Sequence, residues 1–94
     1  MRAIEKRMLQ AVSSKRNFRE SNTEVTNNGN VTKVYLHGNC IYRRDDAKAE
    51  FNLCGWNTPT TRSRLNALGV DVYCKNFTPM VDGKKVSSYG WIKC

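Results

Sequence analysis

The chain has 94 residues, of which 16 are Lys or Arg and 8 are Asp or Glu, so its formal net charge is +8. This length predicts one small domain, residues 1–94, and the charge predicts a positive field that attracts polyanions such as DNA or RNA. No segment resembles a membrane span or a signal peptide, so we expect no membrane partner and no export.

Five apolar residues recur at helical spacing near the start of the chain: Met1, Ile4, Met8, Ala11 and Val12. The pattern predicts an amphipathic helix that ends near residues 13–14. Residues 15–19 then form a basic connection with one aromatic residue, Phe18. Such a segment can bind a nucleic-acid backbone through Lys15, Arg16 and Arg19, or it can be a solvated linker whose Phe18 covers the core edge.

The next segments carry the signals of strands and turns. Residues 23–26 predict a short edge strand, and residues 27–30 predict a turn. Residues 31–42 are rich in β-branched and aromatic residues and are interrupted by Gly38, which indicates either a strand with a bulge or a hairpin that turns at residues 38–39. Residues 48–56 alternate between apolar and polar side chains and predict a half-buried strand.

Residues 43–46 read Arg-Arg-Asp-Asp and predict a charged turn whose side chains neutralise each other. An alternative is that Asp45, Asp46 and Glu50 hold a divalent ion in a nuclease-like arrangement. The two arginines before the aspartates favour the ion-paired turn.

Residues 58–68 predict a short helix. Thr58 can cap the helix, Pro59 suits its first position, and Gly69 supplies a left-handed exit residue. Free N–H groups and hydroxyls in the first turn, followed by Arg62, suit a phosphate or a carboxylate.

The remaining chain predicts three more strand signals: a half-buried strand over residues 70–75, a hairpin at Asp82–Gly83, and a last strand near residues 89–94. The predicted fold class is therefore α+β. An N-terminal amphipathic helix packs on a small, mostly antiparallel sheet, and the second short helix is inserted between strands. Residues 1–20 form the helix and basic connection, and residues 21–94 form the sheet with the short helix 58–68.

The four cysteines lack a Cys-x-x-Cys pair, and a reducing compartment favours thiols over disulfides. His37 and Cys40 are close in sequence, but a strand places them on opposite faces unless the chain turns between them. We therefore expect no metal and no cofactor, with Cys40, Cys54 and Cys74 buried as small apolar side chains and Cys94 exposed.

Three runs carry a resemblance to a known group of proteins: residues 36–39, residues 53–68 with the segment Gly-Trp-Asn-Thr-Pro-Thr-Thr-Arg-Ser-Arg-Leu-Asn-Ala-Leu, and residues 89–91. In these runs the chain resembles small proteins encoded by tailed bacteriophages, over roughly residues 31–91. The resemblance implies a phage origin and a host-cytoplasm setting. It transfers no catalytic residue.

We expect no enzyme, because the chain has a single His and no Gly-rich phosphate loop. The first functional hypothesis is nucleic-acid binding, mainly through phosphate contacts. Its candidate residues are Arg43, Arg44, Arg62, Arg64, Lys15, Arg16 and Arg19. Arg62 and Arg64 lie about 200° apart around a helix, so both cannot point at one partner. Either of them can instead form an ion pair within the domain, with Asp71 or Glu50.

The second hypothesis is a protein–protein binder that inhibits or redirects a host enzyme. Its anchors would be aromatic residues: Trp56, Tyr73, Phe77, Tyr89 and Trp91. The same residues can instead belong to the core. The high net charge favours the first hypothesis.

Overall fold

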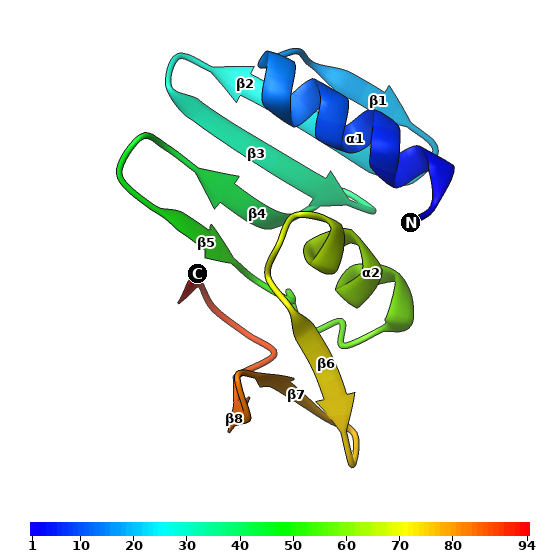
Figure 1. Ribbon diagram of the computed structural model, residues 1–94, viewed down its shortest axis with the longest axis vertical. Coiled ribbons are helices and arrows are strands. Elements are labelled where there is room, and N and C mark those ends of the chain that lie inside the picture. The colour runs from blue at the N-terminus through cyan, green and yellow to red at the C-terminus, as the bar shows by residue number, and fades with distance from the viewer.

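The computed structural model describes residues 1–94 and places two helices and nine strands along the chain. These elements are α1 (Ala3–Ser14), β1 (Phe18–Glu20), β2 (Thr23–Asn28), β3 (Val31–Leu36), β4 (Asn39–Arg44), β5 (Ala49–Phe51), α2 (Pro59–Ala67), β6 (Val72–Lys75), β7 (Thr78–Val81), β8 (Lys84–Lys85) and β9 (Ile92–Lys93). A six-stranded sheet has the order β1-β2-β3-β4-β5-β9, and a second sheet has the order β6-β7-β8 (Figure 1). Every strand pair is antiparallel.

The predicted α+β class is confirmed, with the N-terminal helix first and the second helix between strands. The expectation of one sheet is wrong. After α2 the chain forms its own small hairpin sheet, and only β9 returns to pair with β5 and extend the larger sheet.

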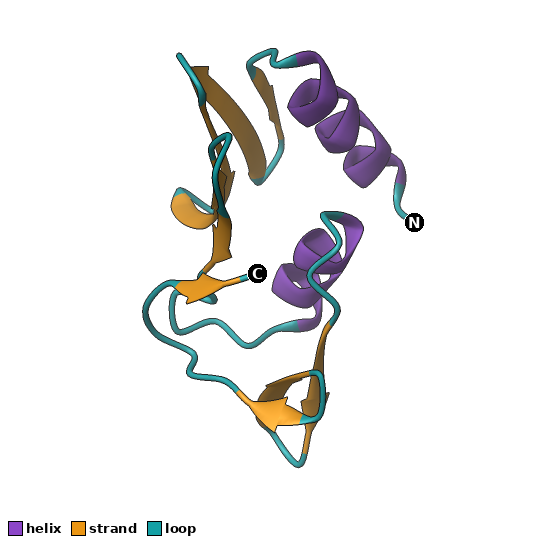
Figure 2. Cartoon of the chain, turned by 60° about the vertical axis from the view of Figure 1, so that its left-hand side comes forward, coloured by secondary structure: helices purple, strands orange, loops and turns teal.

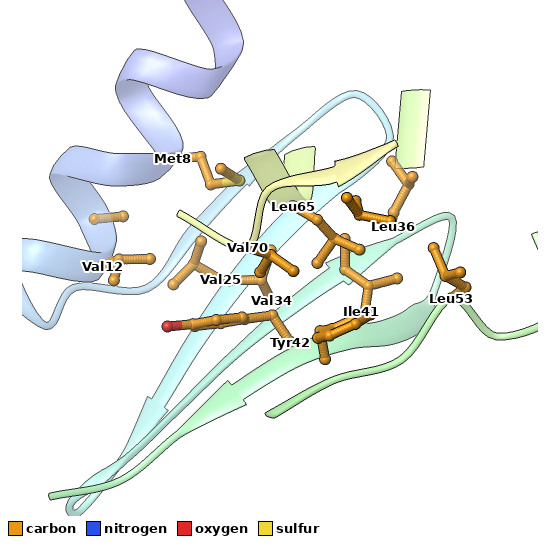
Figure 3. Close-up of a cluster of buried hydrophobic side chains, with 13 residues drawn as sticks. Met8, Val12, Val25, Val34, Leu36, Ile41, Tyr42, Leu53, Leu65 and Val70 are labelled. Atoms are coloured by element: carbon orange, nitrogen blue, oxygen red, sulfur yellow. The ribbon is translucent and has the colours of Figure 1, made fainter. Parts of the chain in front are cut away.

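Both helices pack on one face of the six-stranded sheet (Figure 2). Cross-strand partners share a face, and one row of them crosses β2 to β5 beneath the helices: Val25, Val34, Tyr42 and Phe51. Other core side chains come from the helices and from the segment after α2. They are Met8, Val12, Leu65 and Val70, which are labelled in Figure 3, and Ala11. Hydrophobic burial on this single face therefore holds the fold together.

A β-bulge lies in the β3–β4 ladder, where the register shifts between Val34 and Tyr35. Ile41 and Tyr42 are adjacent in sequence, yet they are 2% and 4% exposed and both point into the core (Figure 3). Alternation alone would place one of them in solvent. The extra residue of the bulge therefore adds a core side chain at this point of the sheet.

The β3–β4 connection is also a tight hairpin, in which His37 and Gly38 have φ of 51° and 78°. Two successive residues with positive φ match the turn that fits the twist of a two-residue hairpin. The two interpretations of Gly38 are thus both partly right: the chain turns here, and a bulge follows in β4.

The helix α2 has the predicted terminal residues. The Thr58 side chain accepts a hydrogen bond from the Thr61 backbone N–H (3.2 Å), Pro59 occupies the first position, and Gly69 has a φ of +91°. The helix ends at Ala67, one residue before the predicted end, and Leu68 is its C-cap.

Several local predictions are wrong. Residues 18–20 are not part of a connection but form β1, the edge strand, and this makes β2 an interior strand. Arg43 and Arg44 end β4 instead of forming a turn. The turn that follows is held by Asp45, whose Oδ1 accepts the Ala47 and Lys48 backbone N–H groups at 2.8 and 2.9 Å.

A buried ion pair joins α1 to α2. Arg64 Nη1 donates to Glu5 Oε2 at 2.7 Å, and both side chains are less than 5% exposed. Ser63 Oγ donates to the same Glu5 oxygen at 2.6 Å, and Arg64 Nε donates to Thr23 Oγ1 on β2 at 3.0 Å. The alternative of an ion pair within the domain therefore holds for Arg64, but its partner is Glu5 and not Asp71 or Glu50.

We expect Glu5→Gln to destabilise the fold by roughly 3 kcal/mol, because a buried guanidinium then lacks its counter-charge. Thermal and denaturant unfolding measure the loss. Replacing both partners with apolar residues, Glu5→Leu with Arg64→Met, restores much of the stability, since no charge remains buried. A double variant less stable than either single variant would contradict this account.

The same pair predicts a pH dependence. Burial raises the pKa of Glu5, but the hydrogen bonds from Ser63 and Arg64 outweigh burial and hold the pKa below the ordinary value of 4.5. The stabilisation is therefore complete above pH 4.5 and is lost as pH falls through the folded-state pKa. In unfolding titrations, the stability gap between the wild type and Glu5→Gln should narrow below pH 4.5.

At the end of α2, Gly69→Ala should destabilise the fold by about 1 kcal/mol. No atom lies within 4 Å of the added Cβ, so the cost is that of the positive φ alone. Gly69→Asn is the matched control, because Asn tolerates this conformation better and should lose less. Equal melting temperatures for the Ala variant and the wild type would contradict the prediction.

Candidate nucleic-acid interface

The face of the six-stranded sheet opposite the helices is not covered by another element, and we call it the open face (Figure 2). Its side chains come from alternate positions of the strands, together with Trp91 just before β9: Arg19, Glu24, Lys33, Tyr35, Cys40, Arg43, Glu50, Trp91 and Lys93. Four cations therefore share this face with two carboxylates.

Lys33 and Arg43 are direct cross-strand partners on the open face. Like charges in this position oppose strand pairing. Glu50 is the cross-strand partner of Arg43 on β5. It relieves the repulsion, because its Oε1 accepts a hydrogen bond from Arg43 Nε at 3.0 Å. Lys33 and Lys93 form no ion pair. The fold thus keeps positive charge here that its own stability does not require.

Arg43 is also held by an aromatic ring. Its guanidinium carbon lies 3.8 Å from the centroid of the Trp91 ring, a cation–π contact. With Nε bonded to Glu50 and the plane stacked on Trp91, the guanidinium is fixed in orientation. Its two terminal nitrogens form no hydrogen bond within the protein, and the side chain is 38% exposed. This is a positioned cation with donors available to an anion.

Cys40 lies among these cations. Burial raises the pKa of its thiol, while a hydrogen bond with the Tyr42 backbone and the charges of Lys33 and Arg43 oppose the shift. The thiol is therefore neutral at physiological pH and adds no negative charge to the open face. Cys40 and Cys54 are partly buried, and Cys94 is exposed as predicted; the prediction that Cys74 is buried is wrong.

The structure separates Arg43 from Arg44. Adjacent residues of a strand point to opposite faces, so Arg44 lies on the helix-bearing face beside the buried Tyr42. Of the seven candidate residues, only Arg19 and Arg43 lie on the open face, and they are on strands β1 and β4, in different cross-strand rows. Arg64 is 3% exposed and bound inside the domain, so in this fold it does not reach a phosphate.

The other three candidates lie elsewhere. Lys15 and Arg16 are exposed at the C-terminal end of α1, where cations also favour the helix dipole. Arg62 is half-exposed on α2 and binds the segment before the helix, donating to the Asn57 carbonyl (3.0 Å) and side-chain oxygen (2.6 Å).

Lys33, Tyr35 and Lys93 were not among the predicted site residues. Lys33 and Tyr35 alternate along the chain with Thr32, Val34 and Leu36, which are buried in the structure. The sequence alone does not show which face of the sheet the helices leave uncovered.

Four of the five aromatic anchors are exposed: Trp56 (60%), Tyr73 (44%), Phe77 (98%) and Tyr89 (75%). Trp56 lines a cavity of about 520 Å³ between the β3–β4 turn and the start of α2, with Leu36, His37 and Thr61 among the other lining residues. The alternative that these four residues form the core is wrong.

No three His, Cys, Asp or Glu side chains gather where they could hold a metal ion. No helix has both the length and the apolar character needed to cross a membrane.

A family model described as Kyanoviridae Gp96 protein matches residues 1–93. No curated protein and no solved structure matches the chain.

Proposed function

We propose that this chain, which belongs to the Kyanoviridae Gp96 protein family and is thus a phage protein, is an accessory protein that binds DNA or RNA in the host cytoplasm. Phosphates supply most of the contacts. The phage origin implied by the sequence resemblance is confirmed by the family match, and the ligand and the setting are proposals.

The open face is the observation that carries this proposal. Lys33, Arg43 and Lys93 lie on it in one cross-strand row that also contains Glu50. Lys33 and Lys93 are three strand spacings apart, about 14 Å. This distance is long enough for a backbone to contact several cations at once. Arg19 on the edge strand β1 extends the positive surface.

The aromatic residues of the open face favour a single-stranded ligand. Tyr35 and Trp91 are half-exposed beside the cations. A flat sheet that combines basic and aromatic side chains can hold phosphates while unpaired bases stack on its rings. Duplex nucleic acid offers the phosphates but keeps its bases stacked internally, so it should bind more weakly.

Lys33→Ala and Lys93→Ala should each weaken binding to single-stranded oligonucleotides of unrelated sequence to the same extent, because phosphates carry no sequence information. Each lost contact should flatten the slope of log affinity against log salt by about 0.7. Fluorescence anisotropy at several salt concentrations measures both effects.

Lys6→Ala is the matched control, because it removes the same charge from an exposed position on α1. It should leave the salt slope unchanged. The proposal fails if the wild type does not bind at low salt, or if Lys6→Ala and Lys33→Ala change the slope equally.

One observation favours the alternative, a host-protein partner. Trp56 and Tyr89 are both exposed. The Tyr89 ring packs directly on Gly55, so closely that a Cβ atom added to Gly55 would lie 2.8 Å from Tyr89 Cε1. Exposed aromatics beside a cavity are typical of protein-binding surfaces. A complex from host lysate that resists nuclease and salt, is lost in Trp56→Ala and is retained in Lys33→Ala would favour this function over the first.

A further inference from the structure

The β6–β7 hairpin carries the most exposed large apolar side chain of the chain. Phe77 is 98% exposed and lies in the two-residue turn between Lys75 and Thr78. This turn is at one end of the longest axis of the molecule, away from both helices (Figures 1 and 2). Phe77 therefore contributes nothing to the core and costs free energy in water.

The backbone at Phe77 is also unfavourable for this residue. Three of the hairpins between paired strands have a two-residue turn with positive φ at both positions, and two of these turns end in glycine: His37–Gly38 (51° and 78°) and Asp82–Gly83 (53° and 75°). The third is Asn76–Phe77, with φ of 51° and 64°. Phe77 thus occupies a position for which glycine is the preferred residue, and a bulky side chain there is strained.

Exposure and strain both act against stability, so neither explains why an aromatic residue occupies this position. Local strain persists at positions where the side chain itself is needed, which makes an observed outlier a reason to look for a contact with a partner. The partner must offer an apolar or aromatic surface to a ring at the tip of a hairpin.

The charges around Phe77 indicate the chemistry of that partner. Tyr73 and Lys75 lie on one face of the small sheet. Lys85 lies on the same face, because Met80 is the cross-strand partner of both Tyr73 and Lys85. Lys84 is exposed as well, and Asp82 is the only acidic residue between Val72 and Lys85. Lys75 borders the turn, and Lys84 and Lys85 lie at the other end of the same hairpin. Cations spread along a hairpin with an exposed aromatic ring at its tip are suited to a nucleic-acid strand, whose phosphates and bases alternate.

We propose that the β6–β7 hairpin is a second nucleic-acid contact, in which Phe77 stacks on an unpaired base, Lys75 holds the adjacent phosphate and Lys85 holds a phosphate further along the same strand. This inference rests on the proposed nucleic-acid function and goes beyond it, because it assigns the contact to an element outside the open face.

Phe77→Gly separates a binding role from a structural one, since the two predict opposite signs. Glycine relieves the positive-φ strain and removes exposed apolar surface, so the melting temperature should rise by a few degrees. Affinity for a single-stranded oligonucleotide should fall about tenfold, the effect of losing one base–aromatic stack. Asn76→Gly is the matched control in the same turn, and it should keep full affinity. Phe77→Trp should also keep the affinity.

The outcomes distinguish this inference from the function on which it rests. If the wild type binds the oligonucleotide and Lys33→Ala weakens binding but Phe77→Gly does not, the hairpin contact is wrong and the open-face function stands. If the wild type does not bind at all, both are wrong. A change only in self-association of Phe77→Gly, measured by analytical ultracentrifugation, would assign Phe77 to a contact between copies of the chain and overturn the proposal.

Discussion

The buried ion pair between Glu5 and Arg64 is the contact on which the arrangement of this small protein depends. It joins two residues 59 positions apart in sequence, and through Arg64 it also reaches Thr23 on β2. Two charges removed from water stabilise a fold only when their hydrogen bonds are satisfied. Here no buried side-chain nitrogen or oxygen lacks a partner. The hydrophobic core holds both helices on one face of the sheet, the ion pair sets how the two helices meet there, and the opposite face is left free.

This arrangement explains which features the sequence could predict. The ends of α2 depend on Thr58, Pro59 and Gly69, which act within a few residues, and they were predicted almost to the residue. The hairpin at Asp82–Gly83 depends on two adjacent residues and was predicted as well. The partner of Arg64 was not, because Glu5 is distant in sequence and its helical position looked polar. The open face required the strand register and the positions of the helices together, and no local pattern contains either.

The structure shows how the cations behind the net charge of +8 are distributed over the fold. Some of the cations serve the fold: Arg64 pairs with Glu5, and Arg7 on α1 pairs with Glu20 on β1. Others do not. Lys33 faces Arg43 across a strand pair and forms no ion pair, an arrangement that costs stability. A net charge alone indicates only attraction to polyanions, whereas a row with excess positive charge on an uncovered sheet face indicates where the attraction acts.

The buried pair also positions the β6–β7 hairpin. Arg64 and Ser63 hold α2 against α1. Asn66, in the same helix, forms two hydrogen bonds with Val72, the first residue of β6. Asn66 Nδ2 donates to the Val72 carbonyl at 2.9 Å, and the Val72 N–H donates to Asn66 Oδ1 at 2.6 Å. The base of the hairpin is thus fixed to a helix whose place is set by an ion pair in the core. The tip with Phe77 forms no such bonds to the helices, which leaves its ring free to meet a ligand. A rigid base and an accessible tip are compatible with a strained turn, because the strain is local and the stability that offsets it lies in the core.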